Sequence, residues 1–415
     1  MSEFQTRRLD SFIADGSVLL GRGDIISKED IEAHPGPYPI YSSSAQGNGK
    51  FGEYGKFMFD EELITWSVDG GGYFFYRDKH RYSVTNVCGY MRIKSWKLHP
   101  KFVFYSLANQ HRYQTFDYTT KAHPSVIQKL YCLPTIGYEQ QKKIATILTG
   151  IDTAIEKTEA LIAKYQQIKA GLMHDLFTRG VLPNGQLRPS REQAPELYQE
   201  TVIGWIPREW ELKPLGQLCD MTSGGTPSRS MPAYWGGSIP WVKTGEINYE
   251  DISRTEEYIT PKGLSASSAK VFPAGTIVMA MYGEGVTRGR VAILAVPCAS
   301  NQACIGFSFG NQIHIKYMYH FFEHCYEELR DLSNDGSQKN LSSGLLKQFQ
   351  IRFPTSKAEQ ACIADRLCNL DQRIASEKEY LQNLCQQKLG LMHDLLTGKV
   401  PVTIESKTTT TEAMA

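Results

Sequence analysis

The sequence lacks most of the features that assign a chain to a class from composition alone. Nine cysteines occur among its 415 residues, but they form no CxxC pair and follow no regular spacing. We therefore expect neither a disulfide framework nor a structural zinc site, and we predict reduced cysteines in the core. No apolar run approaches the roughly 20 residues of a membrane span, and residues 1–10 are polar with no apolar segment behind them. We expect a cytoplasmic protein with no membrane partner.

The charge balance is also uninformative. The chain has 45 basic and 44 acidic side chains, which gives a net charge of +1 and no overall basic excess of the kind that marks many nucleic-acid-binding proteins. Locally, Arg77, Lys79, His80 and Arg81 fall within a segment of five residues, and Arg288 and Arg290 flank a glycine. These clusters are compatible with a solvated surface and with a surface that contacts DNA.

Motifs of nucleotide and methyl-transfer chemistry are missing. The sequence has no GxxxxGK[ST] loop, no Asn-Pro-Pro-aromatic string and no nuclease-like Pro-Asp pair, so we expect no catalytic residue and no metal in this chain. One string, HFFEH at 320–324, could place two zinc-binding histidines one helical turn apart, with the glutamate as base. The neighbouring apolar residues leave both histidines on the polar face of the expected helix. A zinc metallohydrolase at 320–324 is one alternative.

The chain does contain a long internal duplication. Pro134-Thr135 and Glu139-Gln140 recur as Pro354-Thr355 and Glu359-Gln360, and the string GLMHDL occurs at 171–176 and at 390–395. After a single gap behind the Glu-Gln pair, matching residues lie 219 positions apart. Weaker matches precede both segments, for example Asn86 with Asn301 at an offset of 215. Such a long period indicates a tandem-repeat architecture.

Both duplicated segments have the heptad pattern of long helices that pair. The first, from Glu139 to Arg179, has 41 residues, or about 60 Å of helix. Polar residues interrupt the two apolar seams at the same layers, as Thr158 and Glu377 and as Lys169 and Lys388. Because polar seam residues fix register and partner, the matched interruptions predict that the two helices pair with each other.

Each helix follows a segment of mixed α/β pattern. Short apolar runs between turns predict strands at 276–281, 290–296 and 303–309, and helices are expected at 100–109 and 315–332. We therefore predict an α/β (α+β) fold, with two globular domains separated by two long paired (coiled-coil) helices in a pseudo-twofold tandem repeat. The predicted parts are a domain at 1–135, a helix at 136–180, a linker at 181–205, a domain at 206–355, a helix at 356–399 and a disordered tail at 400–415.

These residues resemble those of a known family. The twice-present series of Pro, Glu-Gln, spaced Ile and Leu, and GLMHDL looks like the two conserved regions of type I restriction-modification specificity subunits. The second domain is similar to a target-recognition domain of that family at GGTPSR (224–229), Tyr234-Trp235, Ile239-Pro240-Trp241 and Ser300-Asn301-Gln302. The first domain departs from the family, because Gly21-Arg22-Gly23 stands in place of Gly-Gly-Thr-Pro and no Pro-Trp follows Pro39.

The resemblance implies a division of labour. Each domain would read one half of a bipartite site in double-stranded DNA, and the paired helices would hold the domains at a fixed separation. Two methyltransferase (modification) subunits would dock on the helices, and restriction/translocase subunits would join them. This chain would bind no cofactor, since S-adenosylmethionine, ATP and Mg²⁺ would belong to the partner subunits. A coiled-coil scaffold without DNA contact is the other alternative.

Candidate DNA-contacting residues follow from the chemistry of base edges. In the major groove, Arg or Lys suits guanine and Asn or Gln suits adenine, provided that a loop carries them to the bases. In the first domain we predict Ser43, Gln46, Asn48, Lys50, Arg77 and Lys79, and in the second Thr226, Ser228, Arg229, Lys243, Arg288 and Arg290. The repeated Asn86 and Asn301 are more simply explained as turn-capping residues.

Overall fold

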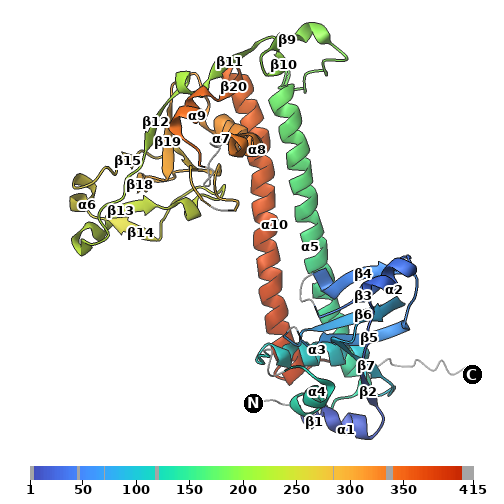
Figure 1. Ribbon diagram of the computed structural model, residues 1–415. Coiled ribbons are helices and arrows are strands. Elements are labelled where there is room, and N and C mark those ends of the chain that lie inside the picture. The colour runs from blue at the N-terminus through green and yellow to red at the C-terminus, as the bar shows by residue number, and fades with distance from the viewer. Residues whose placement is uncertain are drawn as a thin grey trace, which may run out of the picture. The chain divides into compact units, whose positions relative to one another are not determined.

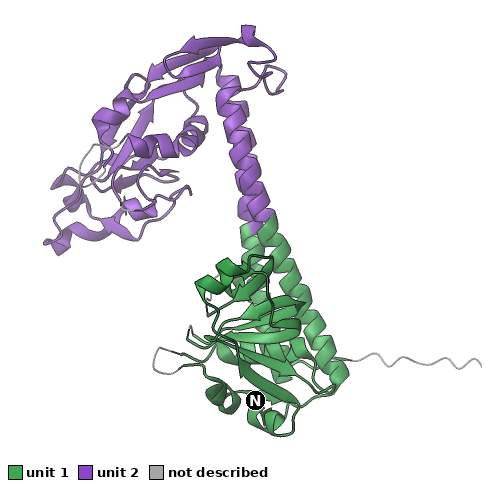
Figure 2. Ribbon diagram, turned by 45° about the vertical axis from the view of Figure 1, so that its right-hand side comes forward, with its two compact units in different colours: residues 1–160, 378–415 green, residues 161–377 purple. Residues whose placement is uncertain are grey.

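The computed structural model describes residues 4–43, 47–69, 71–116, 121–283, 285–332 and 340–403. Gln46 and most of the predicted tail, from residue 404 on, lie outside the described residues. The chain divides into two compact units, unit 1 (residues 1–160 and 378–415) and unit 2 (residues 161–377) (Figure 2). Two helices of 41 residues, α5 (Tyr138–Thr178) and α10 (Lys357–Thr397), labelled in Figure 1, cross this division, so each unit contains part of both (Figure 2).

Unit 1 is built around a six-stranded sheet of order β2-β7-β5-β6-β3-β4. Strands β3 and β6 pair in parallel, and the other neighbours are antiparallel. The sheet comprises β2 (Val18–Arg22), β3 (Tyr38–Tyr41), β4 (Lys50–Tyr54), β5 (Phe59–Ser67), β6 (Phe74–Val84) and β7 (Cys88–Ile93). Beside it lie the pair β1 (Thr6–Arg8) and β8 (Cys132–Pro134) and the helices α1 (Leu9–Ala14), α2 (Lys28–Ala33), α3 (Pro100–His111) and α4 (Pro124–Leu130).

The core of unit 1 forms where β5 meets the helices. The apolar run of β5 buries Ile64 and Trp66 in one cluster with Val103 and Leu107 of α3. The indole N–H of Trp66 donates to the Ala122 carbonyl at 2.7 Å, so burial of this side chain leaves no polar group unsatisfied. The predicted helix at 100–109 is therefore confirmed, and it extends two residues further.

Unit 2 contains two four-stranded sheets, of orders β12-β19-β16-β17 and β14-β13-β18-β15, and two pairs, β11-β20 and β9-β10. Its strands are β9 (Tyr198–Thr201), β10 (Gly204–Pro207), β11 (Trp210–Pro214), β12 (Cys219–Ser223), β13 (Trp235–Val242), β14 (Glu257–Ile259), β15 (Val271–Phe272), β16 (Ile277–Ala280), β17 (Val291–Ile293), β18 (Cys298–Ser300), β19 (Cys304–Phe309) and β20 (Gln350–Pro354). Its short helices are α6 (Pro261–Ser265), α7 (Ile315–His324), α8 (Tyr326–Asp331) and α9 (Ser343–Gln348).

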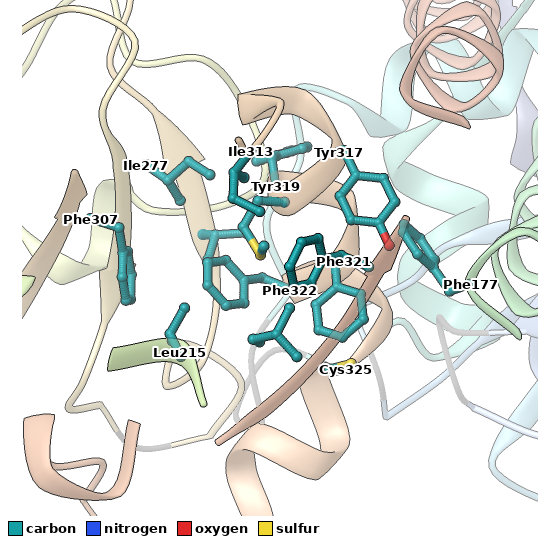
Figure 3. Close-up of a cluster of buried hydrophobic side chains, with 14 of the residues drawn as sticks. Phe177, Leu215, Ile277, Phe307, Ile313, Tyr317, Tyr319, Phe321, Phe322 and Cys325 are labelled. Carbon is teal, nitrogen blue, oxygen red and sulfur yellow. The ribbon is translucent and has the colours of Figure 1, made fainter. Parts of the chain in front are cut away.

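Helix α7 joins the first of these sheets to α5. Figure 3 shows the aromatic rings of α7 between Phe307 of β19 and Phe177 of α5. The Phe177 ring packs edge-on against those of Tyr317 and Phe321, with ring centres 5.4 and 5.5 Å apart. The single helix predicted at 315–332 is wrong in one respect. Because Cys325 has a ψ of 16°, outside the α-helical range, the chain forms two helices, α7 and α8.

The apolar seams of α5 and α10 face each other within each unit. In unit 1, Ile144 and Leu148 of α5 share a buried cluster with Leu395 of α10, and Asp152 pairs with Lys388 at 2.6 Å. Residue numbers rise along one helix as they fall along the other, so the helices are antiparallel. The predicted pairing of the two helices is confirmed.

A buried glutamine fixes each long helix to its own domain. Gln141 accepts a hydrogen bond from the His99 amide at 2.9 Å and donates to the carbonyls of Lys97 and Ile136. Gln360 repeats this pattern with the His314 amide at 2.7 Å and the carbonyls of Gln312 and Pro354. The sequence comparison had aligned Gln140 with Gln360. That alignment is wrong by one residue, because all of α5 matches α10 at an offset of 219 and the gap lies before the helix.

The segment 181–205, predicted as a linker, lies against the start of α10. A carboxylate oxygen of Glu359 accepts from the Val181 amide at 3.0 Å and from the Trp210 indole at 3.1 Å, and it lies 3.3 Å from buried Arg188. Gly180, with a φ of 65°, ends the helical stretch in a left-handed conformation that glycine adopts without strain.

The prediction of cysteines in the core holds only in part. All nine cysteines are unpaired; four of them are buried, but Cys385 is exposed, so the prediction of core cysteines is wrong there. Among the described helices, none combines the length and apolarity needed to cross a membrane.

Candidate nucleic-acid interface

In unit 2, a glycine-rich loop lies against the end of β18. A Cβ atom on Gly224 would lie 2.3 Å from the carbonyl oxygen of Asn301, and one on Gly225 would lie 2.3 Å from the Ala269 amide nitrogen, so only glycine permits this approach. The next residue, Thr226, donates its hydroxyl to the side-chain carbonyl of Gln302. Two motifs 76 residues apart in the sequence therefore form one surface.

Two predicted basic residues meet on this surface. The Arg229 guanidinium lies 3.7 Å from the centre of the Trp235 ring and 2.7 Å from a Glu257 oxygen. Lys243 lies 3.7 Å from the other oxygen of Glu257 and 2.6 Å from Glu256, and hydrogen bonding to Glu256 raises the pKa of Lys243. These ion pairs are at least partly exposed, and such pairs contribute about 0–1 kcal/mol. Both cations can therefore exchange their carboxylate for a phosphate or a base at little cost.

Ser228 belongs to the same group, whereas the two remaining predicted residues of unit 2 lie elsewhere. Ser228 is exposed, and its carbonyl accepts from the indole N–H of Trp235 at 3.2 Å. Arg288 and Arg290 follow β16, and Arg288 is only 9% exposed. Arg290 is half-buried, with its guanidinium 5.8 Å from the centre of the Tyr249 ring. Direct base contact by these two arginines stays a prediction.

In unit 1, the predicted residues that the structure describes lie between β3 and the start of β4 and on β6. Asn48 and Lys50 are exposed there, and Lys50 pairs with Glu53 at 2.6 Å. Ser43, before the turn, is half-buried and accepts at its carbonyl from the Ser67 hydroxyl. Lys79 is exposed on β6.

Arg77, also on β6, is only 2% exposed, and its side chain reaches back to Asn48. Burial lowers the pKa of its guanidinium, and the interaction with Tyr41, which raises that pKa, only partly offsets the effect.

Sequence reasoning missed several members of these surfaces. Gln302, Glu257 and Trp235 complete the surface in unit 2, and Phe51, 59% exposed, flanks Lys50 in unit 1. Gln302 had a usable signal, since it belongs to the Ser-Asn-Gln string. The acidic partners had none, because they are recognised only by their pairing with Arg229 and Lys243, which depends on the tertiary fold.

A buried polar cluster lies where α7 meets α5 and α10. His320 is 1% exposed, with Nδ1 3.2 Å from Glu323 and 3.8 Å from Asp371. These three side chains could hold a cation. However, the Lys169 ammonium lies 2.6 Å from both carboxylates and supplies the positive charge itself. Burial alone would raise the pKa of Glu323, but the hydrogen bond with His320 and the charge of Lys169 outweigh it and lower that pKa.

This geometry does not fit the shared zinc site that HFFEH suggested. His320 was expected on a polar outer face, but that face is buried against α10, and Nε2 of His320 lies 3.5 Å from Cys368 Sγ. His324 stacks on Phe177 at 5.2 Å, and its Nε2 lies 3.5 Å from Arg352. The two imidazoles therefore contact different groups.

Two loop-bearing α/β domains, each attached to a long helix by the same glutamine contact, define a tandem-repeat protein. Comparison with known families gives the same result. The model of the type I restriction modification DNA specificity domain matches residues 1–167 and 207–386. The chain therefore belongs to the specificity subunits of type I restriction-modification systems.

Individual relatives agree. The MjaVIII specificity subunit of Methanocaldococcus jannaschii is 24% identical over 396 residues, which cover 91% of this chain and 89% of that protein. The MjaIX specificity subunit of the same organism is 34% identical over 199 residues, 47% of this chain and 45% of that protein. Among solved structures, the S subunit from M. genitalium has the same fold, with a TM-score of 0.63 at 18% identity over 97% of both chains.

Proposed function

We propose that this chain is the non-catalytic subunit that selects the DNA sequence for a type I restriction-modification complex. The observation that carries the proposal is the duplicated specificity domain, because residues 1–167 and 207–386 both match the family while their loop side chains differ. Two unlike domains on one chain can read two different half-sites. Half-sites about 34 Å apart, or a multiple of that distance, lie on one face of the duplex.

Loop chemistry supports reading by both domains. Asn48 and Lys50 in unit 1 and Arg229 in unit 2 are exposed, Lys243 is half-buried, and all four are of the types that contact base edges and phosphates. The net charge of +1 is compatible with this role if partner subunits supply much of the phosphate contact.

The partners in this proposal are two methyltransferase subunits, joined by restriction/translocase subunits. S-adenosylmethionine, ATP and Mg²⁺ are assigned to these partners rather than to this chain. The complex acts on cellular DNA, and the cytoplasm is its proposed location.

Exposed residues that recur on both long helices support two equivalent docking positions. They have a spacing of i, i+4 and i+7, which places them on one helix face; they are Gln167, Gly171 and His174 on α5, and Gln386, Gly390 and His393 on α10. A Cβ on either glycine would meet no atom within 4 Å, so packing within the chain does not require glycine there. Close approach by two copies of one partner explains the repeat.

Exchange of one domain tests the proposal. Residues 206–355 would be replaced by the corresponding domain of another family member, and methylated sites would be mapped in cells that carry the chimera and the partner subunits. We expect one half-site to change and the other to stay. A change in both halves, or in neither, contradicts modular reading.

Binding of duplex DNA by the assembled complex at several salt concentrations gives an independent test. A DNA-reading subunit gives affinity that falls steeply with salt and depends on sequence. A coiled-coil scaffold without DNA contact would leave the DNA affinity of the partner subunits unchanged.

A further inference from the structure

Asn48, two residues before β4, is held in an unusual conformation. Its φ of 57° and ψ of 21° lie in the left-handed region, which asparagine tolerates better than most residues. The side chain is exposed. The turn therefore presents one amide group to solvent from a fixed backbone position.

Arg77 fixes the orientation of that amide. Its Nη1 donates to the carbonyl oxygen of Asn48 at 2.8 Å and to the side-chain oxygen Oδ1 at 2.9 Å. A guanidinium group only donates hydrogen bonds, so the amide must direct its oxygen toward Arg77. The Nδ2 amino group of Asn48 is therefore the part left for an external acceptor.

Arg77 is itself firmly held and does not face solvent. Its Nε donates to the Thr65 hydroxyl at 3.0 Å, and its guanidinium stacks 3.6 Å from the centre of the Tyr41 ring and 4.8 Å from that of Phe75. With 2% exposure, this side chain acts through Asn48.

We propose that Asn48 donates a single hydrogen bond from Nδ2 to N7 of a purine in the half-site read by the first domain, and that Arg77 is the positioning residue for this contact. The inference rests on the proposed function, and it specifies for one contact which group is the hydrogen-bond donor and which is the acceptor. Two-point recognition of adenine needs both the oxygen and the amino group of an asparagine. Arg77 already donates to that oxygen and sets its direction, so the contact made by Nδ2 does not distinguish the two purines, and it disfavours cytosine, whose major-groove edge offers only a donor. Lys50, two residues on, is exposed and would contact a neighbouring phosphate in this arrangement.

The test uses the full chain assembled with its modification subunits and a duplex that carries the mapped site. Each purine of the half-site is replaced in turn by its 7-deaza analogue, which lacks the N7 acceptor. We expect one position at which the replacement weakens binding by the wild type roughly threefold to tenfold, the range of one neutral hydrogen bond. A duplex with methylphosphonate at the neighbouring phosphates distinguishes a contact to phosphate from a contact to the base.

Asn48→Asp is the decisive variant. The aspartate keeps the left-handed turn and the bond from Arg77 but cannot donate, so affinity should fall while the melting temperature of the complex is unchanged or higher. The sensitivity to 7-deazapurine should also disappear. Asn48→Ala removes the donor without adding charge, and Asn184→Asp adds the same charge at an exposed turn outside the predicted domains. Arg77→Lys cannot make the same two bonds to Asn48, so it should reduce the loss of affinity caused by 7-deazapurine. In the Asn48→Ala background, Arg77→Lys should have no further effect on binding.

The outcomes separate this inference from the proposed function. If the wild type shows no sequence-dependent binding, the proposed function fails. If it binds the site but Asn48→Asp keeps the 7-deaza sensitivity, or if only methylphosphonate positions respond to the variants, the assignment of Asn48 to a purine N7 is overturned.

Discussion

Lys169 of α5 places its ammonium nitrogen 2.6 Å from a carboxylate oxygen of Asp371 in α10. The reverse pair, Lys388 of α10 with Asp152 of α5, has the same separation of 2.6 Å. Both lysines and both aspartates are related by the helix offset, since 388 − 169 = 219 and 371 − 152 = 219. Each helix thus supplies one cation and one anion, and an antiparallel pair of repeated helices satisfies both.

The two ion pairs differ in their surroundings. Asp152 also accepts from the Tyr105 hydroxyl at 2.6 Å. At the corresponding position 215 residues later stands His320, and Lys169 must serve Glu323 as well as Asp371. The Lys169 side chain is 12% exposed and that of Lys388 is 31% exposed.

Replacement of these lysines should therefore have unequal effects. Lys169→Met leaves two carboxylates without their cation in a largely buried site and should lower the free energy of unfolding by about 2–3 kcal/mol. Lys388→Met, the matched control, removes a more exposed pair and should cost about 0.5–1 kcal/mol. Urea unfolding of the two variants checks this, and equal losses would contradict the assigned role of Lys169.

The sequence predicted the long helices well because their signal is periodic. The heptad segment Glu139–Arg179 differs from α5 by one residue at each end, and the predicted helical part 136–180 is two residues longer than α5 at each end. Register was harder, because two consecutive glutamines, Gln140 and Gln141, offer equally good matches to Gln360. Only the hydrogen bonds to the domain distinguish them, and those depend on the tertiary fold.

The burial of Arg77 could not be predicted, because it depends on a bulge. Arg77 and Tyr82 on β6 are five residues apart, and in a regular strand they would point to opposite faces. The register against β5 shifts between Glu61 and Leu63, where β6 has one extra residue. This extra residue lets both side chains face the interior. The charged run 77–81 gives no sequence signal of a bulge.

The register of the glutamine contact gives a second prediction. Gln141→Ala removes three hydrogen bonds and leaves the His99 amide and two carbonyls without that partner, so the free energy of unfolding should fall by about 3 kcal/mol. Gln360→Ala should behave alike. Gln140→Ala, at the neighbouring and partly exposed position, should change stability by less than about 0.5 kcal/mol. Chemical denaturation measures the free energy of unfolding of all three variants. A larger loss of stability for Gln140→Ala than for Gln141→Ala would favour the alignment of Gln140 with Gln360.

His324 predicts a pH dependence of stability. Burial, together with the charges of Arg352 and His174, lowers the pKa of His324 from 6.5 to about 4. The unfolded chain then takes up a proton at a higher pH than the folded chain. Stability is therefore full above about pH 6.5 and is lost as the pH falls toward 4, by about 1–2 kcal/mol after solvent screening.

Asn109 occupies the corresponding position of the first repeat and suggests the control. His324→Asn removes the titrating group, so the slope of unfolding free energy between pH 6.5 and 4 should become shallower. Urea unfolding at several pH values compares this variant with the wild type. An unchanged slope would mean that another group is responsible.

The two exposed helical glycines that recur at equivalent positions, Gly171 and Gly390, make a prediction that separates stability from assembly. Alanine exceeds glycine in helix propensity by about 0.8–1 kcal/mol, and a Cβ at Gly171 or Gly390 meets no atom within 4 Å. Gly171→Ala and Gly390→Ala should therefore each stabilise the isolated chain. If the methyltransferase subunits approach the helix closely at these points, each substitution should also weaken binding of one of the two copies, which titration calorimetry or native mass spectrometry would detect.

Gly150→Ala is the matched control. Gly150 is also helical and exposed with the same open space, but its repeat position is occupied by asparagine, Asn369. Stabilisation of all three variants with unaltered assembly would place the docking surface elsewhere on the helices.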